Sequence, residues 1–123
     1  MGVAIFDKDH ERLATQMSRI NTALLEKHDR ALALNLLESL IYETQAHFDH
    51  EEAVMRNLEF PEREAHVTEH TALIQQAKTM LQQIENGSTS MLALPKFLRT
   101  WLMDHIHITD RKYAAWMRRN GLH

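Results

Sequence analysis

The sequence predicts an all-α protein that folds as an antiparallel, up-down-up-down four-helix bundle. Helix-forming residues dominate its 123 residues, which include only three glycines and two prolines. Apolar side chains recur at alternating steps of three and four residues, which is the spacing of one helix face. Turn signals divide this pattern into four segments of about 20 to 30 residues, and helices of this length with short connections pack antiparallel.

The first two predicted helices each have one inward face. The first runs from about Asp7, a suitable cap, to about Lys27, and its inward face comprises Phe6, His10, Leu13, Met17, Ile20 and Leu24. Asp29 can cap the second helix, and Pro61 ends it because the residue before a proline disfavours helical geometry. The inward face of this second helix comprises Ala33, Leu37, Leu40, Thr44, His47, Glu51, Val54 and Leu58.

The third predicted helix begins at Pro61 or Glu62 and ends at Glu85, before the stop signal Asn86-Gly87-Ser88. Its inward face comprises His66, His70, Leu73, Ala77, Met80 and Ile84. The fourth begins at Ser90, or at Pro95 as its first helical position, and extends to about Asn120. Its inward face comprises Leu98, Leu102, His105, Ile106, Thr109 and Tyr113. Breaks at residues 28, 60 and 87 favour a closed bundle over a coiled coil, and we expect residues 1–123 to form one domain.

The composition excludes several classes of protein. The chain contains no cysteine, which excludes disulfide scaffolds, thiolate metal sites and a cysteine nucleophile. Its 14 basic and 17 acidic residues lack the basic excess of a nucleic-acid binder. No apolar run approaches the roughly 20 residues of a membrane span, and the first residues are not a signal peptide. We therefore expect a cytoplasmic protein with neither nucleic acid nor membrane as a partner.

Histidines occupy inward positions that should be apolar. Five of the nine histidines lie on the inward faces, together with Glu51, and Asp110 lies close to the inward arc of the fourth helix; the five are His10, His47, His66, His70 and His105. A single inward histidine is more often an ordinary core residue with a satisfied hydrogen bond. Two buried carboxylates among five imidazoles need positive charge, which a metal supplies. The pairs His47/Glu51 and His66/His70 are each one helical turn apart, so each directs two ligands to one point.

The ligand types favour iron. Five imidazoles and two carboxylates are too many for one metal, and they suit two borderline metals, iron above all. Ferritin-like bundles use repeated Glu-x-x-His pairs, which this sequence lacks, so a different class of di-iron bundle is indicated.

The chain resembles the hemerythrin family, and specifically the bacterial hemerythrins, over essentially its whole length. The matching stretches are GVAIFDKDH (2–10), HFDHEE (47–52), MRNLEFP (55–61), HVTEH (66–70) and FLRTWLMDHIHITDRKY (97–113). The resemblance implies that His66, His70 and His105 bind one iron and that His10 and His47 bind the other. Glu51 and Asp110 would bridge the two ions together with an oxo or hydroxo group.

The implied function is reversible dioxygen binding, as a carrier, store or oxygen sensor. One iron would have three histidine ligands and the other only two, so the iron with two histidines would keep one vacant coordination position. We expect a dry pocket beside it, which admits dioxygen and excludes water, lined by Leu102, Ile106, Phe48, Leu13 and Trp101. The same residues also suit an ordinary core, and the two roles are compatible. Glu52 is expected either at the surface or in contact with a ligand.

Two other functions stay open. The same centre could serve a di-iron oxidase or peroxidase-type enzyme, but Leu102 and Ile106 offer no acid or base, so we expect no enzyme beyond weak redox activity. It could also be an oxygen- or redox-sensing input domain of a larger signalling protein. Family members usually carry an N-terminal arm with a tryptophan, whereas Met1 directly precedes Gly2 here, which suits a short protein or an excised domain. The expected oligomeric state is a monomer or weak homo-oligomer.

Overall fold

The computed structural model describes residues 4–104 and 110–120, with side-chain positions for residues 11–102 and 115–120. The described part is helical and contains no strand. Its elements in chain order are α1 (Ala4–Leu25), α2 (Arg30–Asn57), α3 (Arg63–Glu85), the 3-10 turn η1 (Met91–Ala93), α4 (Leu94–Asp104) and α5 (Asp110–Arg119). The predicted all-α class is therefore confirmed.

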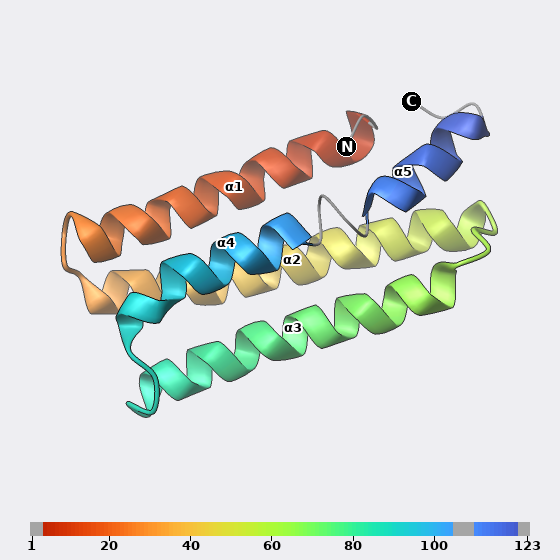
Figure 1. Cartoon of the computed structure of the whole chain (residues 1–123). Helices are drawn as coiled ribbons and strands as arrows, with labels where there is room; N and C mark the ends of the chain where they lie inside the picture. Colours follow the sequence, from red (N-terminus) through yellow and green to blue (C-terminus); the bar gives the residue numbers. More distant parts are fainter. Residues whose placement is uncertain (1–3, 105–109, 121–123) are drawn as a thin grey trace.

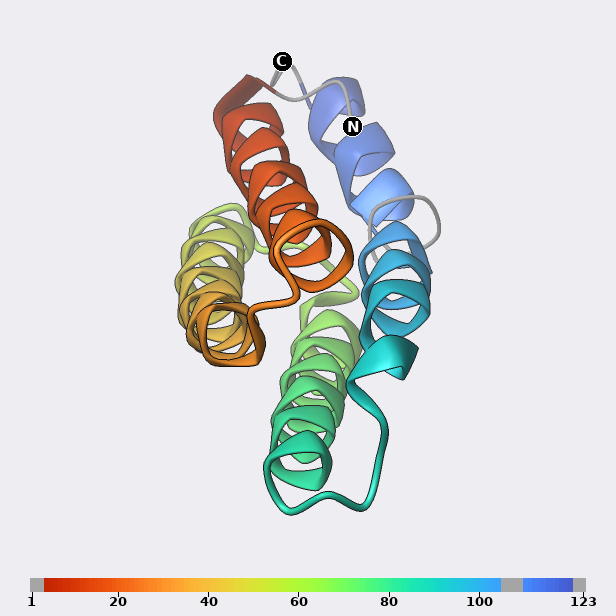
Figure 2. The ribbon, with the colours of Figure 1, turned by 90° about the vertical axis from the view of Figure 1, so that its left-hand side faces the viewer.

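The long helices form an antiparallel bundle. Helices α1, α2 and α3 run in alternating directions, and α4 returns alongside them (Figure 1). Helix α2 packs against both α1 and α3, and α4 packs against α1. Viewed along the bundle, these four helices surround a common interior (Figure 2). The start of α1, the turn between α2 and α3, and α5 lie at one end of the bundle (Figure 1).

Local signals define most of the helix ends. The side chain of Asp29 caps α2 by accepting a hydrogen bond from the Leu32 backbone N–H at 3.0 Å, as predicted. Gly87 follows α3 with a φ of 82°, a conformation that glycine adopts without a steric penalty. The guanidinium of Arg30 donates to the carbonyl oxygen of Ile84 at 2.8 Å, which ties the start of α2 to the end of α3.

The end of α2 differs from the prediction. The helix ends at Asn57, before the limit set by Pro61, because Glu59 adopts a left-handed conformation with a φ of 57°. The backbone N–H of Phe60 then donates to the carbonyl oxygen of Met55 at 2.9 Å, which closes the helix end. Pro61 is thus outside the turn that ends the helix.

The predicted fourth helix corresponds to η1, α4 and α5. Ser90 caps its start, since its hydroxyl accepts from the Leu92 backbone N–H at 3.2 Å. Pro95 lies in the first turn of α4, where its missing N–H is tolerated. Residues 105–109, between α4 and α5, lie outside the described part, so a single continuous helix stays a prediction there.

The core follows the predicted inward faces. The main cluster draws on all four long helices and includes Leu13, Ile20, Leu37, Leu40, Phe48, Leu73, Ala77, Ile84, Leu98 and Leu102. Near the end of α2, however, the predicted inward residues Val54 and Leu58 are only half-buried. Met55 and Phe60 are buried instead and form a second, smaller cluster with Met117 of α5. After Glu51 the buried face of α2 continues to Met55, four residues on, and not to Val54, three residues on. The reason is that the face of a straight α-helix rotates gradually relative to a strict seven-residue repeat.

None of the helices in the described residues combines the length and hydropathy that a membrane span requires.

Candidate metal centre

Two pairs of polar side chains meet inside the bundle. His47 and Glu51 come from α2, and His66 and His70 come from α3. Within each pair the residues are one turn apart, so both side chains leave the same face of their helix. All four are buried, and Glu51 is 0% exposed. The core therefore contains an ionisable cluster at the positions that the sequence pattern singled out.

The carboxylate of Glu51 lies at the centre of this cluster. Its Oε2 is 2.7 Å from Nε2 of His47, within the same helix. Its Oε1 is 3.3 Å from Nε2 of His66 and 3.3 Å from Nε2 of His70, both on α3. The two carboxylate oxygens thus face two separate sets of imidazoles.

These donors fit a metal ion. One ligand atom each from Glu51, His66 and His70 lies within 4.8 Å of the others, so the three can surround one cation. Imidazole nitrogen and carboxylate oxygen suit borderline metals such as iron. A carboxylate removed from water also needs a compensating charge, which a cation bound among these donors would provide.

The other predicted ligands contribute no described side chain. His10 lies in α1 and Asp110 begins α5, but their side chains are outside the described set. His105 lies outside the described residues, and so does Ile106 of the predicted oxygen pocket. The structure thus brings together His47, Glu51, His66 and His70, and the complete ligand set stays a prediction.

The remaining residues of the predicted pocket are buried in the main core. They are Leu13 at 1%, Phe48 at 1%, Trp101 at 5% and Leu102 at 4% exposed. Phe48 stacks directly on His70, with ring centroids 3.8 Å apart and an interplanar angle of 0°. The indole N–H of Trp101 donates to the carbonyl oxygen of Leu73 at 2.9 Å, which satisfies its polar atom inside the core.

Glu52 contacts one of the proposed ligands, a position that the sequence analysis left open between the surface and such a contact. Its Oε2 lies 3.0 Å from Nδ1 of His70, on the side of the ring opposite Glu51. The side chain of Glu52 is 19% exposed, whereas that of His70 is 2% exposed. The sequence signal was the pair Glu51-Glu52 beside a metal-binding pattern. Helix periodicity alone could not predict which residue of α3 Glu52 contacts.

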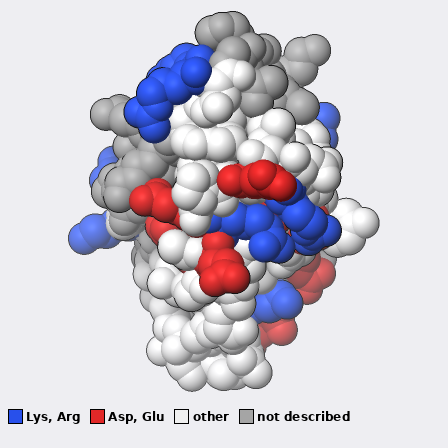
Figure 3. All heavy atoms as spheres, turned by 90° about the vertical axis from the view of Figure 1, so that its right-hand side faces the viewer, with Lys and Arg blue, Asp and Glu red and all other residues white. Residues whose placement is uncertain are grey.

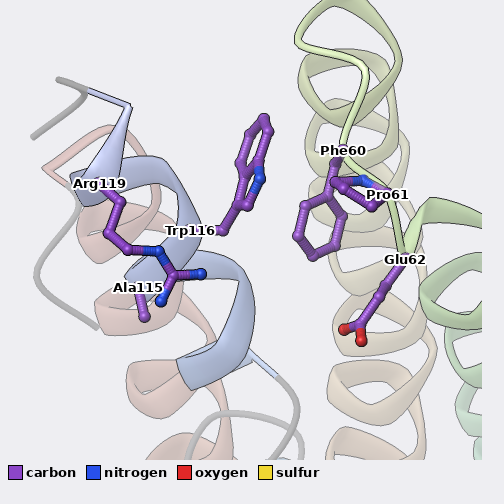
Figure 4. A pocket seen from close by; sticks show the side chains of 6 residues that line it. All are labelled: Phe60, Pro61, Glu62, Ala115, Trp116 and Arg119. Atoms are coloured by element: carbon purple, nitrogen blue, oxygen red, sulfur yellow. The ribbon is translucent and has the colours of Figure 1, made fainter.

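Two hollows lie at the surface near this cluster. One, of about 400 Å³, is lined by residues of α1 and α2 that include Arg12, Tyr42, His47 and His50. The other, of about 410 Å³, lies between α5 and the turn after α2, where Trp116 faces Phe60 and Arg119 lies nearby (Figure 4). Basic and acidic side chains lie side by side on this end of the bundle (Figure 3).

An all-α bundle with imidazoles around a buried carboxylate defines a class of helical metal-binding proteins. The family model described as the Hemerythrin HHE cation binding domain matches residues 1–117. The chain belongs to the hemerythrin family, as its sequence motifs predicted.

Curated relatives carry the name bacteriohemerythrin. The protein of Stenotrophomonas maltophilia (strain R551-3) is 25% identical over 114 residues, which cover 93% of this chain and 74% of the relative. That of Pseudomonas aeruginosa (strain LESB58) is 26% identical over 117 residues, 95% of this chain and 76% of the relative. That of Ralstonia nicotianae (strain ATCC BAA-1114 / GMI1000) is 24% identical over 122 residues, 98% and 85% respectively.

Proposed function

We propose that this chain binds dioxygen reversibly at a non-heme di-iron centre, as a carrier, store or oxygen sensor. The observation that carries the proposal is the placement of Glu51. Its carboxylate is 0% exposed, one oxygen faces His47 of α2, and the other faces His66 and His70 of α3. A carboxylate between two imidazole sets is suited to bridge two metal ions. Membership of the hemerythrin family supports iron as the metal.

The proposed ligand assignment follows the family resemblance. His66, His70 and His105 would hold one iron, and His10 and His47 would hold the other. Glu51 and Asp110 would bridge them with an oxo or hydroxo group. When bound, the iron pair supplies the electrons that reversible dioxygen binding requires. The iron held by only His10 and His47 would keep a position for an external ligand.

The apolar side chains of the core would keep this position dry. Phe48, Leu13, Trp101 and Leu102 are buried, and Ile106 is proposed to join them. By excluding water from the proposed site, these side chains would favour reversible binding over irreversible oxidation of the metal. We propose a non-enzymatic role for the chain, as a cytoplasmic monomer or weak homo-oligomer.

One observation favours the alternative of a di-iron oxidase or peroxidase-type enzyme. The hollow between α1 and α2 brings Arg12, Tyr42 and His50 beside His47, a proposed ligand of the iron with the vacant position. These polar groups could admit a polar substrate by a route separate from Leu102. Turnover of hydrogen peroxide by the iron-loaded protein, abolished in Arg12→Ala, would favour this alternative.

Iron content and the visible spectrum test the proposed function. We expect protein from iron-replete cells to contain two iron ions per chain. Admission of air to the reduced protein should produce a new visible absorption band, and removal of oxygen should reverse it. A content of one metal ion, or bound zinc that iron cannot displace, would contradict the di-iron proposal.

A further inference from the structure

Both ring nitrogens of His70 lie close to carboxylate oxygens. Nε2 lies 3.3 Å from Oε1 of Glu51, and Nδ1 lies 3.0 Å from Oε2 of Glu52. The two glutamates are neighbours on α2 and differ in direction by about 100° around the helix. They therefore reach opposite edges of one imidazole that projects from α3.

A cation bound between Glu51 and His70 would make this arrangement select one tautomer of His70. Glu52 would accept the proton on Nδ1, and the lone pair of Nε2 would be directed toward the proposed metal. The ring of Phe48 stacks on His70 at 3.8 Å with an interplanar angle of 0°, which fixes the plane of the imidazole. Both the plane and the protonated nitrogen would thus be set by the protein.

We propose that Glu52 is a positioning residue that presents His70 as an Nε2 ligand and lowers the reduction potential of the metal bound there. The electronic part of this inference rests on the proposed di-iron function. A carboxylate that accepts the Nδ1 proton makes the imidazole a stronger electron donor, which stabilises the more oxidised metal. Glu52 is 19% exposed and does not belong to the apolar core cluster, so we expect its variants to fold.

The primary experiment is a redox titration of the iron-loaded protein, followed by visible absorption. Glu52→Gln keeps an oxygen that can accept the Nδ1 proton but removes the negative charge. We expect this variant to keep its iron and to titrate at a more positive midpoint potential than the wild type. Glu52→Ala removes the acceptor as well, and its affinity for iron in competition with a chelator should fall about 10–100-fold.

Asp49→Asn is the matched control. Asp49 lies three residues before Glu52 on α2, is exposed, and accepts a hydrogen bond from Gln45 at 2.9 Å. The variant removes the same charge nearby without touching His70. A shift in Glu52→Gln that is no larger than in Asp49→Asn would overturn the electronic role. Lowered thermal stability in both Glu52 variants, with an unchanged potential, would show a merely structural residue and would also overturn it.

A second measurement separates this inference from the dioxygen function. In protein loaded with diamagnetic Zn(II) and labelled with ¹⁵N-histidine, the Nδ1 proton of His70 should exchange slowly with solvent, and much faster in Glu52→Ala. Unchanged exchange would refute the positioning role. A wild-type protein that binds no iron pair would instead refute the proposed function, and the exchange rate would then decide the role of Glu52 alone.

Discussion

Leu102 is the residue at which the oxygen-pocket proposal can be tested most directly. It is 4% exposed on α4 and lies one turn before His105 in the sequence. Replacement by Asn would place an amide and associated water beside the proposed vacant position. We expect iron to be retained, because no proposed ligand changes, and the oxygenated state to decay several-fold faster in a wet pocket. The lifetime of the oxygenated absorption band measures this effect.

Leu98→Asn provides the control for that prediction. Leu98 is also buried on α4, at 1% exposed, and lies a further turn from His105. Both substitutions should destabilise the fold by a similar amount, on the order of 3 kcal/mol. Only Leu102→Asn should shorten the oxygenated lifetime. An unchanged lifetime in variants of both Leu102 and Ile106 would show that the ligand binds on another face.

At the same scale, the sequence predicted those contacts that depend on one helix. His47 with Glu51, and His66 with His70, follow from positions four residues apart. The contact between Glu52 and His70 depends on how α2 is rotated against α3, which the period of neither helix specifies. The stacking of Phe48 on His70 also depends on how α2 is rotated against α3. The contacts between helices are therefore the part of the site that the spacing of residues in the sequence could not predict.

At the scale of the element, local capping chemistry predicted the start of α2 better than its end. Asp29 caps α2 through its own side chain, so a short stretch of sequence suffices to predict it. The end of α2 depends on Phe60, whose ring packs against Trp116 of α5 at a centroid distance of 5.1 Å. The backbone N–H of Phe60 closes the helix end on the carbonyl oxygen of Met55, and Glu59 before it lies in the left-handed region. No glycine marks the left-handed position, and Pro61 indicates only a later limit for the helix, so the exact end could not be predicted from the sequence.

Glu59→Gly should stabilise the protein. Glu59 is exposed and has a φ of 57°, a conformation that disfavours any residue with a Cβ atom. Relief of this strain, less the greater entropy that glycine has in the unfolded chain, should raise the free energy of unfolding by about 0.5–1 kcal/mol. Glu59→Ala removes the same carboxylate but keeps Cβ, and it should give no such gain. Chemical denaturation at a fixed metal content measures both, and equal stability of the two variants would argue against strain at this turn.

At the scale of the whole molecule, the bundle folds around an ionisable carboxyl group in its core. Helices α2 and α3 close over Glu51 and its three imidazoles, while apolar residues form the surrounding core. A carboxylate in such surroundings opposes folding unless it is compensated. A metal that binds only the folded chain converts its binding free energy into stability of the bundle. A metal bound at this site would therefore link the stability of the fold to the contact between α2 and α3.

Removal of the metal should consequently lower the melting temperature. Metal at 100 times its dissociation constant stabilises a folded protein by about 2.7 kcal/mol for each site, so chelation should produce a loss of at least this order. In Glu51→Gln an amide replaces the proposed bridging carboxylate, and the difference in melting temperature between iron-loaded and chelated protein should largely disappear. Glu38→Gln, an exposed position on α2, should keep the wild-type difference. Calorimetry on the three proteins with and without iron provides the measurement. A wild-type melting temperature unaffected by complete iron removal would show that the buried carboxylate is compensated without a metal.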